Sequence, residues 1–405
     1  MNYLLPTIAS NTLAQLVSKF FGAGLTFVIT VLIIRLASPA VFGDLTKSLV
    51  LIGLGFTLAD FGLNAITVRA LSQGSDLSKE FSTLLYTRLS LSIIILITLN
   101  LVLYIMPDPY SLSIRGVFLL GSISLIFQGM YTTCNAIFQY QQNYWLSTIS
   151  TVLGTTVSAG LTYYYLVTSP TLAHFLLATT IGYFAMAVAS LSLVGIKPVS
   201  VKSASVVRLL KAATPLGAIL LASVASSKLD TLVLGSYWAS SVVGEYGFAY
   251  RIFDVLLVVP VFLTNALYPH LVLVKKQTSY TLLKTGLATM FFAGFLLAFI
   301  SYLASPLLNI IRPGLNDSIR SLKLLSLGLP FFFTTAPLMW YLIAQNLEKK
   351  VLYTYLLATA FNLISNLIFV PSYGLTASAL VTGVTELLIF LALLYHAVKL
   401  NQTNN

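Results

Sequence analysis

Long apolar segments recur along the whole chain, and they are the feature that most constrains its fold. Runs of about 20 mostly apolar residues, the length that crosses a bilayer as a helix, number about twelve. Their approximate bounds are 10–35, 45–68, 82–106, 114–139, 144–168, 172–195, 206–236, 246–271, 279–304, 320–345, 350–370 and 375–398. Only 8% of the 405 residues are charged, against about 25% in soluble proteins. We therefore expect an all-α polytopic membrane protein without a sizeable soluble domain.

Positive charge is distributed unevenly among the short loops. The net charge of +11 would suggest nucleic acid in a soluble protein, but cytoplasmic loops of membrane proteins are also rich in Lys and Arg. The loops on the side of the C-terminus carry twice as many basic residues as the opposite loops. The bias predicts a multi-pass membrane protein with both termini in the cytoplasm and no nucleic-acid partner.

Two short motifs indicate an internal repeat. "VFGDL" at 41–45 follows the first predicted span, and "VVGEY" at 242–246 follows the seventh. Each motif begins a new helix after a short turn, and the offset is close to half the chain. Parallel repeats of this kind form two bundles around a pseudo-twofold axis along the membrane normal. We expect two pseudo-symmetric six-helix lobes, 1–200 and 201–405, around a central cavity.

Eight charged side chains remain within the predicted spans once the charges assigned to loops are set aside. A charge facing lipid at the bilayer centre costs about 2.5–3.5 kcal/mol or more, so such groups are expected to face the bundle interior or water. Arg251 and Asp254, three positions apart, are expected to form a local pair. Both a structural role and a binding role are open for the set, which comprises the bases Lys19, Arg88, Lys228 and Arg251 and the acids Asp60, Asp230, Asp254 and Glu386.

A stripe of amide and aromatic side chains follows the fourth span and its end. The spacing of three or four residues places these side chains on one helical face. Amides exchange hydrogen bonds with sugar hydroxyls, but polar residues also join helices in membranes. The candidate glycan-lining residues are Gln128, Tyr131, Asn135, Gln139 and Gln142, with Asn362 and Asn366 as a second pair.

The chain contains no motif typical of an enzyme active site or of an ATPase. Cys134 is the single cysteine, and His174, His270 and His396 are far apart in the sequence, so no metal-ligand spacing occurs. A phosphate-binding glycine loop and a serine elbow are also missing from the sequence. We expect a transporter without a catalytic site or bound cofactor, and its energy would come from an ion gradient such as H⁺ or Na⁺, from the membrane potential or from the gradient of the substrate itself.

Two longer stretches resemble a known family. "RLASPAVFGDLTKSLVLIGLGFTLADFGLNAITVRALSQ" at 35–73 resembles the N-terminal signature of polysaccharide transport proteins of the MOP superfamily. "LDTLVLGSYWASSVVGEYGFAYR" at 229–251 resembles the signature of the seventh helix of that family. The resemblance in layout covers nearly the whole chain and is closest to Wzx-type flippases of O-antigen or capsule units.

The resemblance implies a bacterial inner-membrane flippase with a MATE-like, MOP-like fold. Its cargo would be a glycan on undecaprenyl diphosphate, carried while the lipid tail stays in the bilayer. A polysaccharide polymerase and a chain-length regulator would be partners. In this interpretation Lys19, Arg88, Lys228 and Arg251 bind the diphosphate or acidic sugars, while Asp60, Asp230 and Glu386 couple an ion or pair the lobes.

The equal number of acids and bases inside the spans departs from a purely cationic lumen. A MATE-like efflux transporter for cationic, amphipathic solutes is therefore the main alternative. A polysaccharide polymerase would be expected to have a large outer loop, and the longest loop on that side covers only about 305–319. A non-transporting scaffold would give no reason for lysines inside spans.

Overall fold

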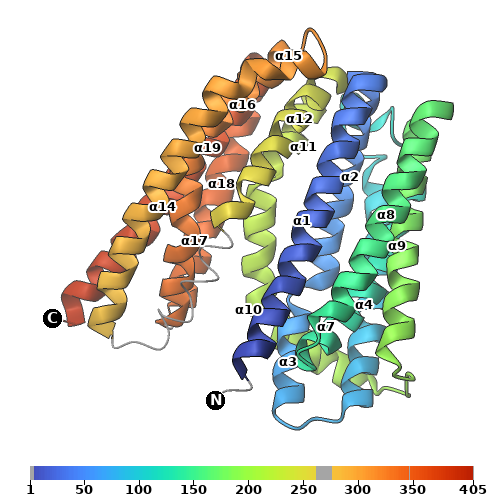
Figure 1. Ribbon diagram of the computed structural model, residues 1–405, viewed down its shortest axis with the longest axis vertical. Coiled ribbons are helices and arrows are strands. Elements are labelled where there is room, and N and C mark those ends of the chain that lie inside the picture. Colours follow the sequence, from blue (N-terminus) through green and yellow to red (C-terminus); the bar gives the residue numbers. More distant parts are fainter. Residues whose placement is uncertain (1–3, 261–275, 346, 405) are drawn as a thin grey trace. The chain divides into compact units, whose positions relative to one another are not determined.

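The computed structural model describes residues 4–260, 276–345 and 347–404, and the described residues form helices and no strands (Figure 1). The all-α prediction is confirmed. The first helices are α1 (Leu4–Leu36), α2 (Pro39–Asp60), α3 (Leu63–Ser72), α4 (Leu77–Val102), α5 (Asp108–Ser111), α6 (Phe118–Ser122), α7 (Ser124–Tyr140), α8 (Tyr144–Thr168), α9 (Leu172–Val194) and α10 (Ser203–Ser226). They are followed by α11 (Leu229–Tyr237), α12 (Ser240–Leu256), α14 (Lys276–Ala304), the 3₁₀ turn η1 (Ser305–Leu307), α15 (Leu308–Ile311), α16 (Asn316–Ser326), α17 (Leu329–Ala344), α18 (Glu348–Tyr373) and α19 (Leu375–Asn404).

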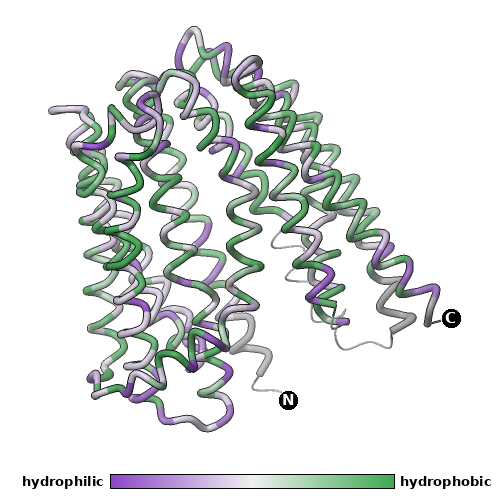
Figure 2. The backbone as a smooth tube through the Cα atoms, turned by 180° about the vertical axis from the view of Figure 1, so that it is seen from behind, coloured by the Kyte–Doolittle hydropathy of each residue, from purple (hydrophilic) through white to green (hydrophobic). Residues whose placement is uncertain are grey.

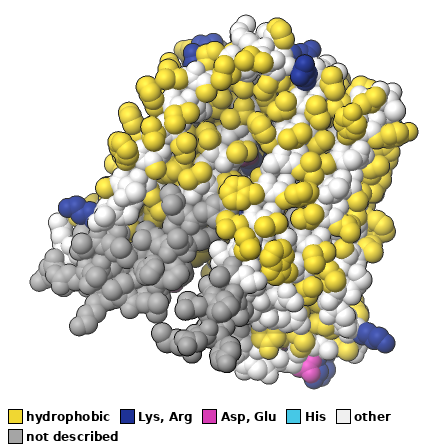
Figure 3. Space-filling model, in the orientation of Figure 1, with side chains coloured by type: hydrophobic (Ala, Val, Ile, Leu, Met, Phe, Trp, Pro, Cys, Tyr) yellow, Lys and Arg dark blue, Asp and Glu magenta, His cyan; other side chains and the backbone are white. Residues whose placement is uncertain are grey.

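The long helices are apolar along most of their length, as the hydropathy colouring shows (Figure 2). Within the described residues, eight helices are long and apolar enough to cross a membrane, or nine if α16 and α17 count as one bent span. Of the other expected spans, α7 and α12 have only 17 residues each, and α8 carries many hydroxyl side chains. Apolar side chains dominate the described part of the face seen in Figure 3, with Lys and Arg mostly at its margins. The chain is a multi-pass membrane protein.

The chain divides into two compact units, Met1–Leu221 and Ala222–Asn405, with the division inside α10. In the first unit α8 packs against α1 and α9, and α7 packs against α4 and α9. In the second unit α18 packs against α11 and α19, and α17 packs against α14 and α19. The order of helix pairing therefore recurs in the two units, which agrees with the repeat of the two sequence motifs. The predicted boundary between residues 200 and 201 stays a prediction.

Several helices expected to be continuous are broken, among them the following three. The predicted helix 45–68 is divided between α2 and α3 at Phe61 and Gly62, whose φ angles are 42° and 70°. The predicted helix 206–236 is divided at Ser227 and Lys228, and 320–345 is bent by 46° between α16 and α17. Predicted spans do not show such breaks, because a hydropathy window of about 20 residues averages over both sides of the break. The end of the predicted helix 246–271, with His270, lies outside the described residues.

Close approach of α8 and α9 depends on two glycines that face each other. A Cβ atom added at Gly154 would lie 2.6 Å from the carbonyl oxygen of Gly182, and one added at Gly182 would lie 2.8 Å from that of Gly154. Small residues allow such approach between membrane helices, where van der Waals packing supplies much of the association energy. The contact fixes the α8–α9 pair of the first unit.

Candidate functional site

The first unit buries a charged cluster around Arg88 of α4, whose side chain is fully buried. Its Nη2 group donates to the Asp60 carboxylate at the end of α2 and to the Asn64 side chain on α3, both at 2.8 Å. Its Nη1 group donates to the Thr133 hydroxyl of α7 at 3.2 Å. Two predicted site residues, Arg88 and Asp60, are thus brought together as an ion pair within one unit. The cluster joins four helices.

The second unit buries the Asp230 carboxylate of α11, which is 0% exposed. One oxygen accepts from the backbone N–H of Thr231 at 2.6 Å and from the Thr231 hydroxyl at 3.2 Å. The other oxygen accepts from the Tyr246 hydroxyl of α12 and, at 3.0 Å, from the Thr382 hydroxyl of α19. Four donors therefore satisfy this carboxylate and connect α11, α12 and α19.

Lys228, at the break before α11, pairs with Asp254 of α12 at 3.8 Å. Its ammonium group also lies over the Tyr250 ring, 4.6 Å from the ring centroid. The prediction of a local Arg251–Asp254 pair is therefore wrong for the described residues. The break between α10 and α11 brings Lys228 to the same α12 carboxylate. Arg251 is half-buried, and Lys19 is exposed on α1.

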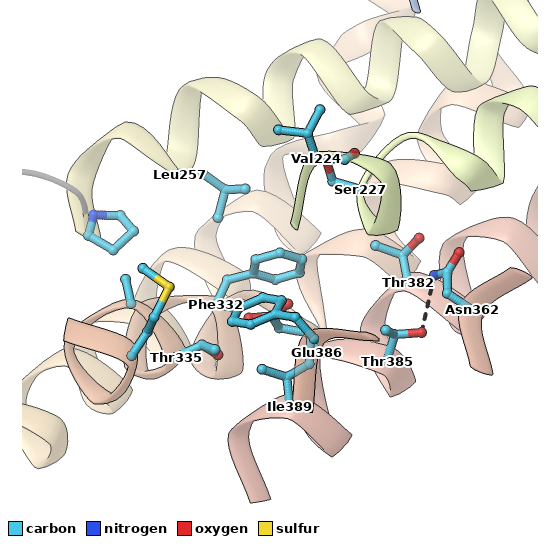
Figure 4. A pocket seen from close by; sticks show the side chains of 14 residues that line it. Val224, Ser227, Leu257, Phe332, Thr335, Asn362, Thr382, Thr385, Glu386 and Ile389 are labelled. Carbon is cyan, nitrogen blue, oxygen red and sulfur yellow. Dashed lines mark hydrogen bonds between the residues drawn. The ribbon is translucent and has the colours of Figure 1, made fainter. Parts of the chain in front are cut away.

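A cavity of about 280 Å³ lies within the second unit (Figure 4). The side chains of Glu386 and Asn362, both predicted site residues, line it together with Phe332. Its other polar side chains are hydroxyls on α17, α18 and α19 and at the α10–α11 break. They belong to Ser227, Thr335, Tyr355, Thr382 and Thr385. No Lys or Arg lines this cavity among the described residues, so its single ionisable carboxyl, Glu386, makes it suited to a cation or a proton.

Asparagines on α18 extend the polar wall of this cavity inward. Asn362 donates to the Thr385 hydroxyl at 3.1 Å, the contact drawn in Figure 4. Asn366 donates to the carbonyl and side-chain oxygens of Asn362, and its own Oδ1 atom is buried without a hydrogen-bond partner in the described part of the chain. Both asparagines are fully buried. They are held by interhelical and local bonds.

The amide stripe of α7 is only partly on one helix. Tyr131 bonds to the Ser147 and Thr151 hydroxyls of α8 at 3.1 and 2.9 Å, which joins the two helices. α7 ends at Tyr140, so Gln142 lies in the following turn, where its φ angle is 56°. Gln128, Asn135 and Gln139 are half-buried on α7. Their glycan-lining role stays a prediction.

Several polar residues of these clusters were not predicted from the sequence. They are Asn64, Thr133, Tyr246, Thr335 and Thr382. All are uncharged, so a search for ions inside spans passes over them. A search for hydroxyls and amides four residues from an internal charge would have found Asn64, after Asp60, and Thr382, before Glu386. The hydrogen bonds that these uncharged side chains make to the charged groups join residues at least 16 positions apart, so only the tertiary fold brings them together.

Comparison with known proteins identifies relatives by family and by fold. The sequence profile of the family described as "Polysaccharide biosynthesis protein" matches residues 8–275. No curated protein sequence matches the chain.

Solved structures similar to the chain include a lipid flippase and multidrug transporters. The lipid II flippase MurJ in an inward closed conformation has a TM-score of 0.80 at 16% identity, covering 95% of this chain and 87% of that chain. An inward-facing multidrug resistance MATE transporter of the MOP superfamily has a TM-score of 0.66 at 14% identity, covering 98% and 96%. The Vibrio cholerae MATE transporter VcmN has a TM-score of 0.65 at 17% identity, covering 100% and 98%. The chain therefore has a MOP-type fold.

Proposed function

The chain belongs to the polysaccharide biosynthesis protein family, and we propose that it is a flippase for a lipid-linked oligosaccharide. The cargo is an O-antigen or capsule repeat unit on undecaprenyl diphosphate, moved from the cytoplasmic to the outer leaflet of the bacterial inner membrane. Transport proceeds by alternating access of two lobes, 1–200 and 201–405, with both termini in the cytoplasm. A polysaccharide polymerase and a chain-length regulator act beside it.

The observation that carries the proposal is the family match over residues 8–275, joined to a fold shared with a lipid II flippase. The physical argument concerns the free-energy cost of moving the polar part of the cargo through the hydrocarbon of the bilayer. A sugar unit and two phosphates lose their hydration in hydrocarbon, and each polar group left without a partner costs several kcal/mol. Polar groups inside an apolar helix bundle, such as those around Arg88 and Glu386, are the means by which a protein lowers that cost.

The predicted cations differ in how well they suit an anionic cargo. Arg88 is fully buried and already paired with Asp60, so it supports the first unit. The Lys228 side chain is 29% exposed and its 3.8 Å pair with Asp254 is long, so it exchanges partners at lower cost. Under our proposal Lys228, Arg251 and Lys19 contact the diphosphate or acidic sugars, and the carboxyl that exchanges an ion is Glu386.

The decisive experiment is a complementation test in a strain that lacks the gene. Undecaprenyl-linked glycans are labelled, and their accumulation on the cytoplasmic face is measured. We expect wild type to relieve the accumulation, Lys228→Ala to fail, and Lys228→Arg to retain part of the activity. Lys284→Ala, which removes an exposed lysine of α14, is the matched control and should behave as wild type. Normal export in the deletion strain without a second transporter would refute the proposal.

A MATE-like efflux function is the second candidate, and the Glu386 cavity favours it. A carboxyl group beside Phe332 and Tyr355, with no basic side chain among the described residues that line the cavity, is suited to an aromatic or amphipathic cation. Expression in a strain sensitive to cationic dyes separates the two functions. The second candidate would replace the first if wild type exports the dye, Glu386→Gln does not, and neither protein affects glycan export.

A further inference from the structure

α18 and α19 form a second groove, whose lining does not include Glu386. The groove has a volume of about 510 Å³ and contains Lys350 and His396 at one end and Tyr353, Leu357, Phe361 and Leu388 along its length. Tyr353 and Leu357 are 63% and 73% exposed, so the groove opens outward from the bundle. In a membrane protein such a surface faces lipid.

Basic groups gather at one end of this groove. Lys350 belongs to the first turn of α18 and His396 to the last turns of the antiparallel α19. The Nδ1 atom of His396 is buried and has no hydrogen-bond partner among the described residues. No acidic residue lines the groove, and Lys350 has no ion pair within the described part of the chain. Lys399 adds to the positive potential at His396.

We propose that this groove binds an anionic phospholipid, with its phosphate between Lys350 and His396 and an acyl chain along Leu357 and Phe361. The interval from Lys350 to Phe361 on α18 rises about 17 Å at 1.5 Å per residue. One leaflet of hydrocarbon is about 15 Å thick, half of the bilayer core. The groove therefore spans one leaflet, with its basic end at the headgroup level.

A neighbouring pocket on the same helix pair shows that the basic end is particular to this groove. That pocket has a volume of about 370 Å³, runs from Phe361 to Tyr373 and Thr376, and contains no charged residue. It would accept only an acyl chain. Basic pockets between transmembrane helices on the cytoplasmic side are suited to anionic headgroups. In the predicted orientation Lys350 and Lys399 lie on that side, where anionic lipid gives the surface its negative potential.

The lining favours a phospholipid over the glycolipid cargo as occupant. Besides the basic pair, its polar side chains are Tyr353 and Thr354, and the Thr354 hydroxyl already donates to the Lys350 carbonyl oxygen at 2.9 Å. Little remains to bind a set of sugar hydroxyls. This inference is independent of the proposed function, because a MATE-like transporter would carry the same groove.

The test measures phosphatidylglycerol binding by the full-length protein, purified in detergent and titrated with this lipid or with phosphatidylcholine. Native mass spectrometry counts retained lipid, and a thermal shift reports its effect. We expect wild type to retain phosphatidylglycerol in preference to phosphatidylcholine. The double variant Lys350→Ala/His396→Ala should bind it roughly tenfold more weakly. Lys349→Ala, which removes the adjacent exposed lysine, is the charge-matched control and should bind as wild type.

A second variant tests the groove without changing its charge. Ala392→Trp places a large ring among the lining residues and should also weaken binding. Equal retention of phosphatidylglycerol by wild type and both variants would overturn the proposal. Undecaprenyl phosphate at equal or lower concentration would be added as a competitor. If it displaces phosphatidylglycerol from wild type, and if the variants also bind undecaprenyl phosphate more weakly, the choice of a phospholipid as occupant would be overturned. Glycan export in the complementation assay is a separate readout, so the two proposals fail independently.

Discussion

Removal of the Asp60 carboxylate is the most informative perturbation of the buried charges in the first unit. Asp60→Ala takes away the only carboxylate that pairs with Arg88 among the described residues and leaves a guanidinium that is 0% exposed. Its Nε group already lacks a hydrogen-bond partner there, and the remaining acceptors, Asn64 and Thr133, are uncharged. The expected result is a large loss of stability, because a buried charge without its counter-ion is strongly unfavourable.

The size of the expected stability loss follows from how deeply each partner of the Arg88–Asp60 pair is buried. Breaking a buried ion pair by removing one partner costs about 3–5 kcal/mol. The Asp60 side chain is 34% exposed, so solvent screens the pair, while Asn64 and Thr133 still hold the guanidinium. We therefore expect Asp60→Ala to lower the free energy of unfolding by about 2–3 kcal/mol. Arg88→Met should cost less, about 1–2 kcal/mol, because the carboxylate that it leaves reaches solvent.

The assay is reversible unfolding of the purified protein in mixed micelles, followed by far-ultraviolet circular dichroism. The double variant Asp60→Ala/Arg88→Met should be more stable than Asp60→Ala alone, because it removes the unpaired charge. Asp108→Ala breaks the pair with Arg115, in which the Asp108 side chain is 71% exposed, and serves as the control. It should cost less than about 1 kcal/mol. A double variant no more stable than Asp60→Ala would refute the reasoning.

Two further predictions concern packing and the Asp230 network. Gly154→Ala should destabilise the first unit by about 1–3 kcal/mol, because the new Cβ would meet the Gly182 carbonyl oxygen. Gly160→Ala on the same helix meets nothing within 4 Å and should be neutral or stabilising. Thermal unfolding midpoints of the two variants check both expectations, and equal effects would contradict the contact. Asp230→Ala should lower the free energy of unfolding by about 2–4 kcal/mol, because it leaves buried donors unpaired. The loss should exceed that of Asp254→Ala, because the Asp254 side chain is 37% exposed. The reverse order of stability in a denaturant titration would contradict this account.

The sequence was sufficient to predict the helical membrane fold, because the constraint is local. A helix satisfies its own backbone hydrogen bonds in lipid, so every sufficiently long apolar run is driven to the same secondary structure. The predicted span 144–168 coincides with α8, and 172–195 differs from α9 by one residue. Hydropathy predicts the interruptions between consecutive helices less well. At Phe61 and Gly62 the left-handed backbone is supported by contacts to Leu216 and Gly217 of α10, which are distant in sequence.

The charged members of the candidate clusters could be identified from the sequence, whereas their uncharged members and the contacts among them could not. The cost of a charge in lipid singles out Arg88, Asp60, Asp230 and Glu386 from their positions within apolar runs. Which groups they contact depends on helix packing. The Lys228–Asp254 pair arises because the chain breaks before α11 and α12 packs against that helix. The spacing of residues along one helix predicted Arg251 as the partner of Asp254, because such spacing takes no account of residues on other helices.

The three acids of the predicted coupling set are distinguished by their surroundings. Asp60 has a cation at 2.8 Å, and Asp230 has four hydrogen-bond donors, so in each case removal of the negative charge would abandon interactions that hold several helices together. Glu386 interacts with Thr335 and opens into a cavity without a basic residue among its described lining. Loss or gain of a cation at Glu386 therefore breaks fewer structural contacts. An ion that drives transport needs a carboxyl with this property, because a group that stabilises the resting fold through many bonds exchanges its ligand only at the expense of that fold.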